Sequence, residues 1–152
     1  MRSNNIIHLP NNLPDVLYGD VVRVCDWVQE RTPYIEGFDV FNEDTQTIGF
    51  TKNNRIVCGV VYTDYRGRDI QMHCACDDPS VWTRENIRIC FHYPFNQLGV
   101  VRVTALVPST YERALSINQR LGFQVEGVLR DFIETDVDVV LLGMMRHECK
   151  WI

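Results

Sequence analysis

The sequence has 152 residues and a mass of 17.7 kDa, the size of one domain with its own hydrophobic core. Its 45% hydrophobic and 23% charged residues are typical of a globular chain and exclude a disordered, collagen-like or coiled-coil protein. The net charge of −5 and the short apolar runs predict no nucleic-acid partner and no membrane partner. The first residues also lack the pattern of a secretory signal, so we expect a single domain over residues 1–152 in the cytoplasm.

The first predicted element is a helix over Asp15–Glu30, because apolar residues recur there at three- and four-residue steps and Pro33 follows. From Thr45 to Asp77 the pattern changes to short β-branched runs separated by turn residues. These runs predict an antiparallel meander of three strands, at Thr47–Lys52, Arg55–Asp64 and Asp69–Cys76.

Helical spacing returns after Pro79, with Thr83 as the N-cap, and continues until Gly99. Pro94 is expected to distort the last turn of this helix. The near-continuous apolar run Val100–Val107 is typical of a strand that is buried on both faces. The last predicted elements are a helix at Thr110–Leu121 closed by Gly122, and an antiparallel pair of strands at Phe123–Glu134 and Asp136–Arg146.

The six cysteines show no spacing that a disulfide framework or a zinc ribbon requires, so the sequence predicts free buried thiols. Only residues 73–92 contain several cysteines and histidines, the side chains that bind transition metals, close together in sequence. Their spacing is poor, however, because two cysteines on a strand share a face while Cys90 and His92 diverge on a helix. The prediction is therefore core thiols and no metal site among His73, Cys74, Cys76, Cys90 and His92.

The predicted order of elements is helix, three strands, helix, strand, helix, strand, strand. With its single strand-helix-strand crossover, this order resembles the GCN5-related N-acetyltransferase (GNAT) superfamily. The sequence also resembles the branch similar to ribosomal-protein N-terminal acetyltransferases, and two further segments, Tyr93–Gly99 and Glu148–Trp151, are similar to a small subset from proteobacteria and their phages. The resemblance to the branch is carried by Val101–Val107, Tyr111–Ala114, Asn118–Phe123, Glu126–Arg130 and Gly143–Arg146.

The resemblance implies an α/β (α+β) fold class: a mixed, mostly antiparallel sheet of six to seven strands, flanked by helices. It further implies that the sheet splays between Asp69–Cys76 and Val100–Val107, and that acetyl-CoA lies in the opening, where its amide-bearing arm satisfies unpaired backbone groups. We expect no metal. The residues that the resemblance assigns to acetyl-CoA binding are Ala75, Cys76, Trp82, Thr83, Arg84, Glu85, Tyr111 and Asn118.

The sequence departs from the family at the segment Asp78–Glu85, which corresponds to the loop that binds the diphosphate. That loop normally contains closely spaced glycines, whereas this chain has no glycine between Gly67 and Gly99. Asp77 and Asp78 would repel a diphosphate unless they point away from it.

Three neighbouring side chains in this segment bear on the same question. Arg84 and the Thr83 hydroxyl can partly compensate for the carboxylates. Trp82 either covers an adenine or packs on the core as a residue at the start of the helix, and the second reading is favoured.

A second departure concerns the position where many relatives carry a tyrosine as general acid, because here it is Asn118, which can donate a hydrogen bond to sulfur but no proton. The implied chemistry is direct attack of an amine on the thioester. The catalytic candidates are Asp77, His73 and Asn118, with Glu126 as a further possible base. His73 can instead be a packing or surface residue, Asp77 a turn former, and Cys76, a nucleophile in principle, a core residue.

Two functions follow from these observations. The first is an acetyl-CoA-dependent N-acetyltransferase that acts on a primary amine, which can be a protein N-terminus, a lysine or a small amine. The alternative is a GNAT-fold binding or structural protein with weak or no activity, including a phage-associated one in the host cytoplasm. Acidic residues in Asp15–Phe41 and Glu134–Asp138 would suit a cationic acceptor or form a solvated surface, and a homodimer remains open.

Overall fold

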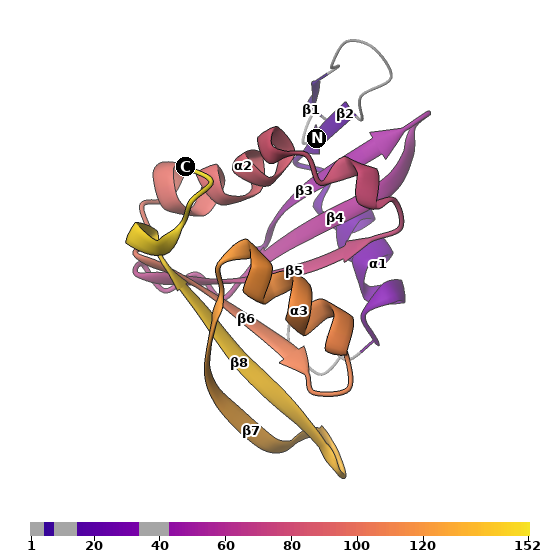
Figure 1. The fold of residues 1–152 in the computed structure, drawn as a ribbon. Coiled ribbons are helices and arrows are strands. Elements are labelled where there is room, and N and C mark those ends of the chain that lie inside the picture. The colour runs from indigo at the N-terminus through magenta and orange to yellow at the C-terminus, as the bar shows by residue number, and fades with distance from the viewer. Residues whose placement is uncertain (1–4, 8–14, 34–42) are drawn as a thin grey trace.

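The computed structural model describes residues 5–7, 15–33 and 43–152. The strands form one sheet in the order β1-β2-β3-β4-β5-β6-β8-β7, in which β5 and β6 run parallel and the other neighbours antiparallel (Figure 1). The strands are β1 (Asn5–Ile7), β2 (Asp15–Tyr18), β3 (Gln46–Lys52), β4 (Arg55–Thr63), β5 (Asp69–Cys76), β6 (Arg102–Pro108), β7 (Gln124–Glu134) and β8 (Val137–Met145). The helices are α1 (Val21–Arg31), α2 (Arg84–His92) and α3 (Glu112–Leu121).

This architecture confirms the predicted mixed, mostly antiparallel sheet flanked by helices. Without the three-residue β1, seven strands remain, which agrees with the expected six to seven. Among the described residues no helix is long and apolar enough to cross a membrane.

The start of the predicted first helix was wrong, because residues 15–18 form β2 and only Val21–Arg31 is helical. β2 pairs with β3, and the buried side chains Val16 and Leu17 face opposite sides of the sheet. Gly19, with φ of +77°, then turns the chain into α1. Two adjacent apolar residues fit either a helix or a strand buried on both faces, so periodicity alone could not separate them.

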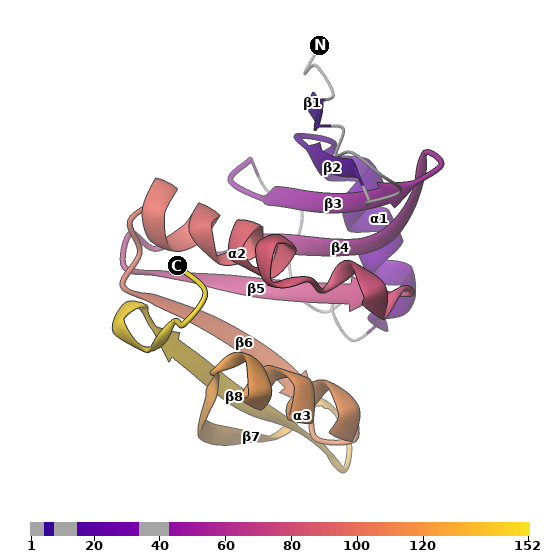
Figure 2. The ribbon, with the colours of Figure 1, turned by 45° about the horizontal axis from the view of Figure 1, so that its top comes forward.

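The helices cover both faces of the sheet. α2 and α3 lie on one face and α1 lies on the other (Figure 2). α1 approaches β4 closely, since a Cβ at Gly59 would lie 2.8 Å from Cγ2 of Val28. The absence of a side chain on Gly59 therefore sets the spacing between α1 and the strands that border the site.

Several local predictions are confirmed. Thr83 caps α2, since its Oγ1 accepts a hydrogen bond from the Asn86 amide at 3.2 Å. At Pro94 the helix widens into a π-helical turn over Tyr93–Gln97, because proline cannot donate the regular helical hydrogen bond. Gly122 closes α3 with φ of +120°.

The cysteine prediction needs two corrections. Cys58 and Cys76 lie directly opposite each other on β4 and β5, with their Cα atoms 4.1 Å apart, and they form a disulfide. Cys76 is therefore neither a free thiol nor a nucleophile. Cys74 is exposed rather than buried, whereas Cys25, Cys90 and Cys149 are buried free thiols as expected.

Candidate functional site

The site begins where two parallel strands separate. β5 and β6 pair only from Asp69 to Gln71 on one strand and from Arg102 to Thr104 on the other. Beyond these residues β5 continues along β4 while β6 continues along β8, so the two strands diverge (Figure 2). Within the described part of the chain, no strand pairs with the backbone edges that face each other across this gap, and the predicted splay is confirmed.

A cleft of about 940 Å³ occupies this gap and reaches both faces of the sheet. Its walls on one face come from α2 and α3. On the other face they come from the end of α1 and from β5. Residues that line it include Ile87, Phe91 and Ala114 on the first side, and Arg31, Thr32 and His73 on the second.

The cleft brings together most, but not all, of the site residues expected from the sequence. Four do not line it: Thr83, Arg84 and Glu85, which lie exposed at the start of α2, and Glu126 on β7, whose Oε1 accepts a hydrogen bond from Nη2 of Arg102 at 2.6 Å. The expected residues that do line it are His73, Ala75, Cys76, Asp77, Trp82, Tyr111 and Asn118.

His73 reaches the cleft from the α1 side of β5. Its side chain is only 4% exposed, and Nε2 lies 2.9 Å from the Thr63 Oγ1 in a hydrogen bond. Burial lowers the pKa of the imidazole to about 4 because the charged form loses its hydration. At neutral pH His73 is therefore uncharged and can accept a proton or share a hydrogen bond.

Asp77 lies just past the end of β5, where its amide still donates to the carbonyl of Val57 at 2.8 Å. Its carboxylate is held by Arg31 of α1, whose Nε and Nη2 each donate to it at 2.9 Å. The Arg31 guanidinium also stacks on Trp27, with Cζ 3.6 Å from the ring centroid. Arg31 was missed from the sequence because 46 residues separate it from Asp77 and no local pattern links them.

On the opposite wall, Tyr111, the residue just before α3, and Asn118 within α3 both line the cleft. The backbone carbonyl of Asn118 accepts hydrogen bonds from the Gly122 and Phe123 amides at 3.2 and 3.0 Å.

Cys74 is a further cleft residue on β5 that the sequence did not single out as a site. Its side chain is exposed, but neighbouring protein atoms replace part of the water around the sulfur. This desolvation raises the pKa of its thiol to about 12. Cys74 is therefore protonated at neutral pH and is a poor nucleophile. Period-two alternation from Cys76 is the sequence signal that placed Cys74 on this face.

The segment between β5 and α2 is folded on itself. Asp78 caps a short 3₁₀ turn at Pro79–Val81, and its Oδ2 lies 2.6 Å from the Nζ of Lys52. Trp82 packs edge-to-face on Phe50 with ring centroids 5.9 Å apart, which supports the core reading of this residue over an adenine cover. A diphosphate could bind here only if the Asp78 carboxylate pointed away from the segment. Instead, this carboxylate accepts hydrogen bonds from Ser80 within the segment.

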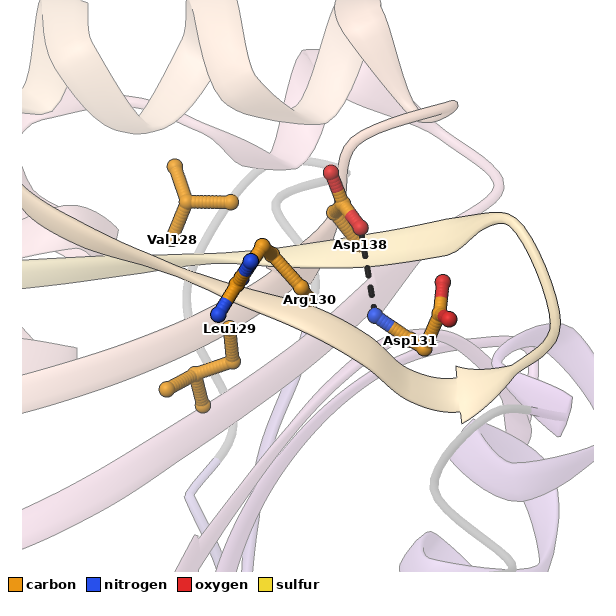
Figure 3. A pocket seen from close by; sticks show the side chains of 5 residues that line it. All are labelled: Val128, Leu129, Arg130, Asp131 and Asp138. Carbon is orange, nitrogen blue, oxygen red and sulfur yellow. Dashed lines mark hydrogen bonds between the residues drawn. The ribbon is translucent and has the colours of Figure 1, made fainter.

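A second hollow lies on the β7–β8 hairpin, away from the cleft, and is lined by Val128, Leu129, Arg130, Asp131 and Asp138 (Figure 3). There the Asp131 amide donates to Oδ1 of Asp138 at 3.2 Å where the pairing of the two strands is interrupted. This hollow is built from a single hairpin and has no parted strands, so the cleft between β5 and β6 is the candidate site.

Solved structures of several acetyltransferases resemble this arrangement. A mutant of spermidine N-acetyltransferase SpeG from Vibrio cholerae superposes with a TM-score of 0.66 at 12% identity, covering 93% of this chain and 98% of that chain. Ribosomal-protein-S5-alanine acetyltransferase from Vibrio fischeri gives 0.64 at 12% identity, with 98% and 100% covered.

A third structure, a putative acetyltransferase from T. thermophilus, gives 0.64 at 12% identity, with 97% and 93% covered. The chain has the GNAT fold. No protein-family model matches the sequence, and no curated protein sequence is similar to it. At these identities the GNAT likeness concerns the fold, and the activity must be argued from the cleft itself.

Proposed function

We propose that this GNAT-fold chain transfers an acetyl group from an acetyl thioester, acetyl-CoA in the first instance, to a primary amine by direct attack. The observation that carries the proposal is the cleft that passes between β5 and β6 and opens on both faces of the sheet. A donor can enter from the α2 and α3 side while an acceptor enters from the α1 side. The two reactants then meet inside the sheet, where water is limited.

The donor side fits the pantetheine arm of such a thioester. The diverging edges of β5 and β6 offer backbone donors and acceptors to the two amides of the arm, while Ile87 and Ala114 supply apolar walls. The donor supplies an activated acetyl group with a thiolate as leaving group. Asn118 lies in the wall where its amide can donate a hydrogen bond to the departing sulfur.

The acceptor side is formed by His73 and by the pair of Arg31 and Asp77. In the reaction the amine nitrogen bonds to the carbonyl carbon, the carbon–sulfur bond breaks, and the amine gives up one proton while the thiolate gains one. The uncharged His73 lines the cleft, where it can accept a hydrogen bond from the amine and help its proton leave towards the thiolate. Asp77, held in place by Arg31, accepts a hydrogen bond from the uncharged incoming amine and so orients its lone pair.

One observation favours a second function: the segment around Asp78 forms its hydrogen bonds within itself and with Lys52. If that segment prevents any thioester from binding, the chain is a GNAT-fold binding or structural protein instead of an enzyme. The two functions are distinguished by whether an acetyl thioester binds and is consumed.

The test incubates the protein with acetyl-CoA and a panel of amines: spermidine, a peptide with N-terminal alanine, and a lysine-containing peptide with a blocked N-terminus. The acetylated product is measured by mass spectrometry, which identifies the acetylated amine directly. We expect turnover of at least one amine, and a kcat lowered by about tenfold in Asn118→Ala through loss of one hydrogen bond to sulfur.

The matched control is Gln119→Ala, which truncates the neighbouring, exposed residue of α3 outside the cleft and should leave kcat unchanged. If no amine on the panel is acetylated above the rate without protein, whether or not acetyl-CoA binds, the binding or structural function is the correct one.

A further inference from the structure

We propose that the acyl donor is recognised through its pantetheine arm alone, because the segment before α2 uses most of its own backbone amides internally and fixes the negative charge of Asp78 beside them. This inference rests on the proposed function in that both concern the same cleft. It goes further by naming the part of the donor that contributes binding free energy.

The backbone amides of the segment are the first observation. A diphosphate is held by free N–H groups, but four consecutive amides here already have partners within the segment. A fifth amide, that of Asn86 in the first turn of α2, is taken by the Thr83 side chain. The four bonds run from the amides of Ser80, Val81, Trp82 and Thr83 to Oδ1 of Asp78 and to the carbonyls of Asp78, Pro79 and Val81, at 3.1, 3.1, 3.1 and 2.7 Å respectively.

The second observation is that Asp78 is itself bound as an anion would be. Its Oδ1 accepts hydrogen bonds from the amide and the hydroxyl of Ser80 at 3.1 and 2.6 Å, and its Oδ2 lies 2.6 Å from Lys52 Nζ. The hydrogen bonds from Lys52 and Ser80 lower the pKa of this carboxyl to about 2, so it is charged at every physiological pH. Lys52 is thus already neutralised, and an incoming diphosphate would meet a fixed negative charge.

The third observation concerns the other cations and anions near the start of α2. The guanidinium of Arg84 lies 5.8 Å from the Trp151 ring centroid, on the side of the C-terminal tail and not in the cleft. Glu85 adds a further carboxylate in the first turn. In contrast, the deeper part of the cleft, between the diverging strands, keeps the apolar walls and open strand edges that suit the arm.

Isothermal titration of the wild-type protein with three probes tests the inference: acetyl-CoA, acetyl-pantetheine and adenosine 3′,5′-bisphosphate. We expect the two thioesters to bind with dissociation constants within about tenfold of each other and the nucleotide to give no measurable binding. A Kd for acetyl-CoA more than a hundredfold below that of acetyl-pantetheine would overturn the inference and leave the proposed function standing. Binding of neither thioester would overturn both.

Asp78→Asn provides the second arm, because asparagine keeps an oxygen that accepts from Ser80 while it removes the charge and releases Lys52. We expect the affinity for acetyl-CoA to rise by about tenfold and that for acetyl-pantetheine to stay the same. Asp136→Asn is the matched control, since it removes one negative charge from the distant β7–β8 turn and should change neither value (Figure 1). Equal affinities for acetyl-CoA in the wild type and in a folded Asp78→Asn protein would contradict the role of Asp78. The wild-type titrations decide the matter if that variant does not fold.

Discussion

Acidification should destabilise this protein through one buried imidazole. His73 is 4% exposed, its Nε2 is engaged with the Thr63 hydroxyl, and burial lowers its pKa from the usual 6.5 to about 4. Between these two values the unfolded chain binds a proton at this position and the folded chain does not. The stability due to the uncharged imidazole is therefore fully present above pH 6.5 and is lost progressively as the pH falls towards 4.

The size of this loss follows from the same interval. At about 1.4 kcal/mol for each pH unit, the interval between 6.5 and about 4 corresponds to roughly 3 kcal/mol. This is an upper value, since relaxation and water entry around the charged ring would reduce it. It is still a large share of the roughly 5–15 kcal/mol that stabilises a domain of ordinary stability.

The assay is urea unfolding followed by circular dichroism at pH 7, 6, 5 and 4, for the wild type and for His73→Gln. Glutamine keeps a polar group near the Thr63 hydroxyl but has no charge to gain, so its stability should fall less between pH 7 and pH 4, by up to about 3 kcal/mol. His147→Gln, at the exposed C-terminal turn, should follow the wild type. Parallel pH profiles of the wild type and His73→Gln would refute the reasoning.

Three further changes test the packing and the acceptor side. Gly59→Ala places a Cβ 2.8 Å from Cγ2 of Val28 and should lower the free energy of unfolding by about 1–3 kcal/mol; an unchanged urea midpoint would contradict this close packing. Tyr62→Phe removes a fully buried hydroxyl that donates to a carbonyl of α2 at 2.6 Å, and it should cost about 1 kcal/mol in the same measurement. Arg31→Gln removes the hydrogen bonds to Asp77 from a side chain that is 31% exposed, so stability should change by less than about 1 kcal/mol. Its KM for the amine should rise severalfold, and an unchanged KM would remove the pair from the acceptor site.

Features that depend on local chemistry could be predicted from the sequence. The N-cap at Thr83, the widened turn at Pro94 and the positive φ of Gly122 each follow from one residue and its immediate neighbours. The meander and the crossover strand follow from hydrophobic periodicity over seven to nine residues, which short loops do not disturb. The splay of the sheet came from the resemblance, since no property of β5 or β6 alone shows where their pairing stops.

Features that depend on contacts distant in sequence could not be predicted. The ion pair of Arg31 with Asp77 and the disulfide of Cys58 with Cys76 depend on how α1, β4 and β5 are placed next to one another. β2 was missed because it is a strand only through its pairing with β3, and four residues are too few to show a hydrophobic period.

The segment before α2 shows how local folding and ligand binding compete for the same backbone groups. Glycines at such a position leave the backbone amides available to a ligand, because a glycine has no side chain that could accept hydrogen bonds from them. Here Asp78 and Thr83 each cap a turn within six residues, and Pro79 begins the first turn without an amide of its own. Each cap stabilises the segment by consuming an amide that an anion would need. The residues that make this segment fold well in the absence of a ligand therefore weaken it as an anion site, which supports the proposal that the parted strands hold the donor.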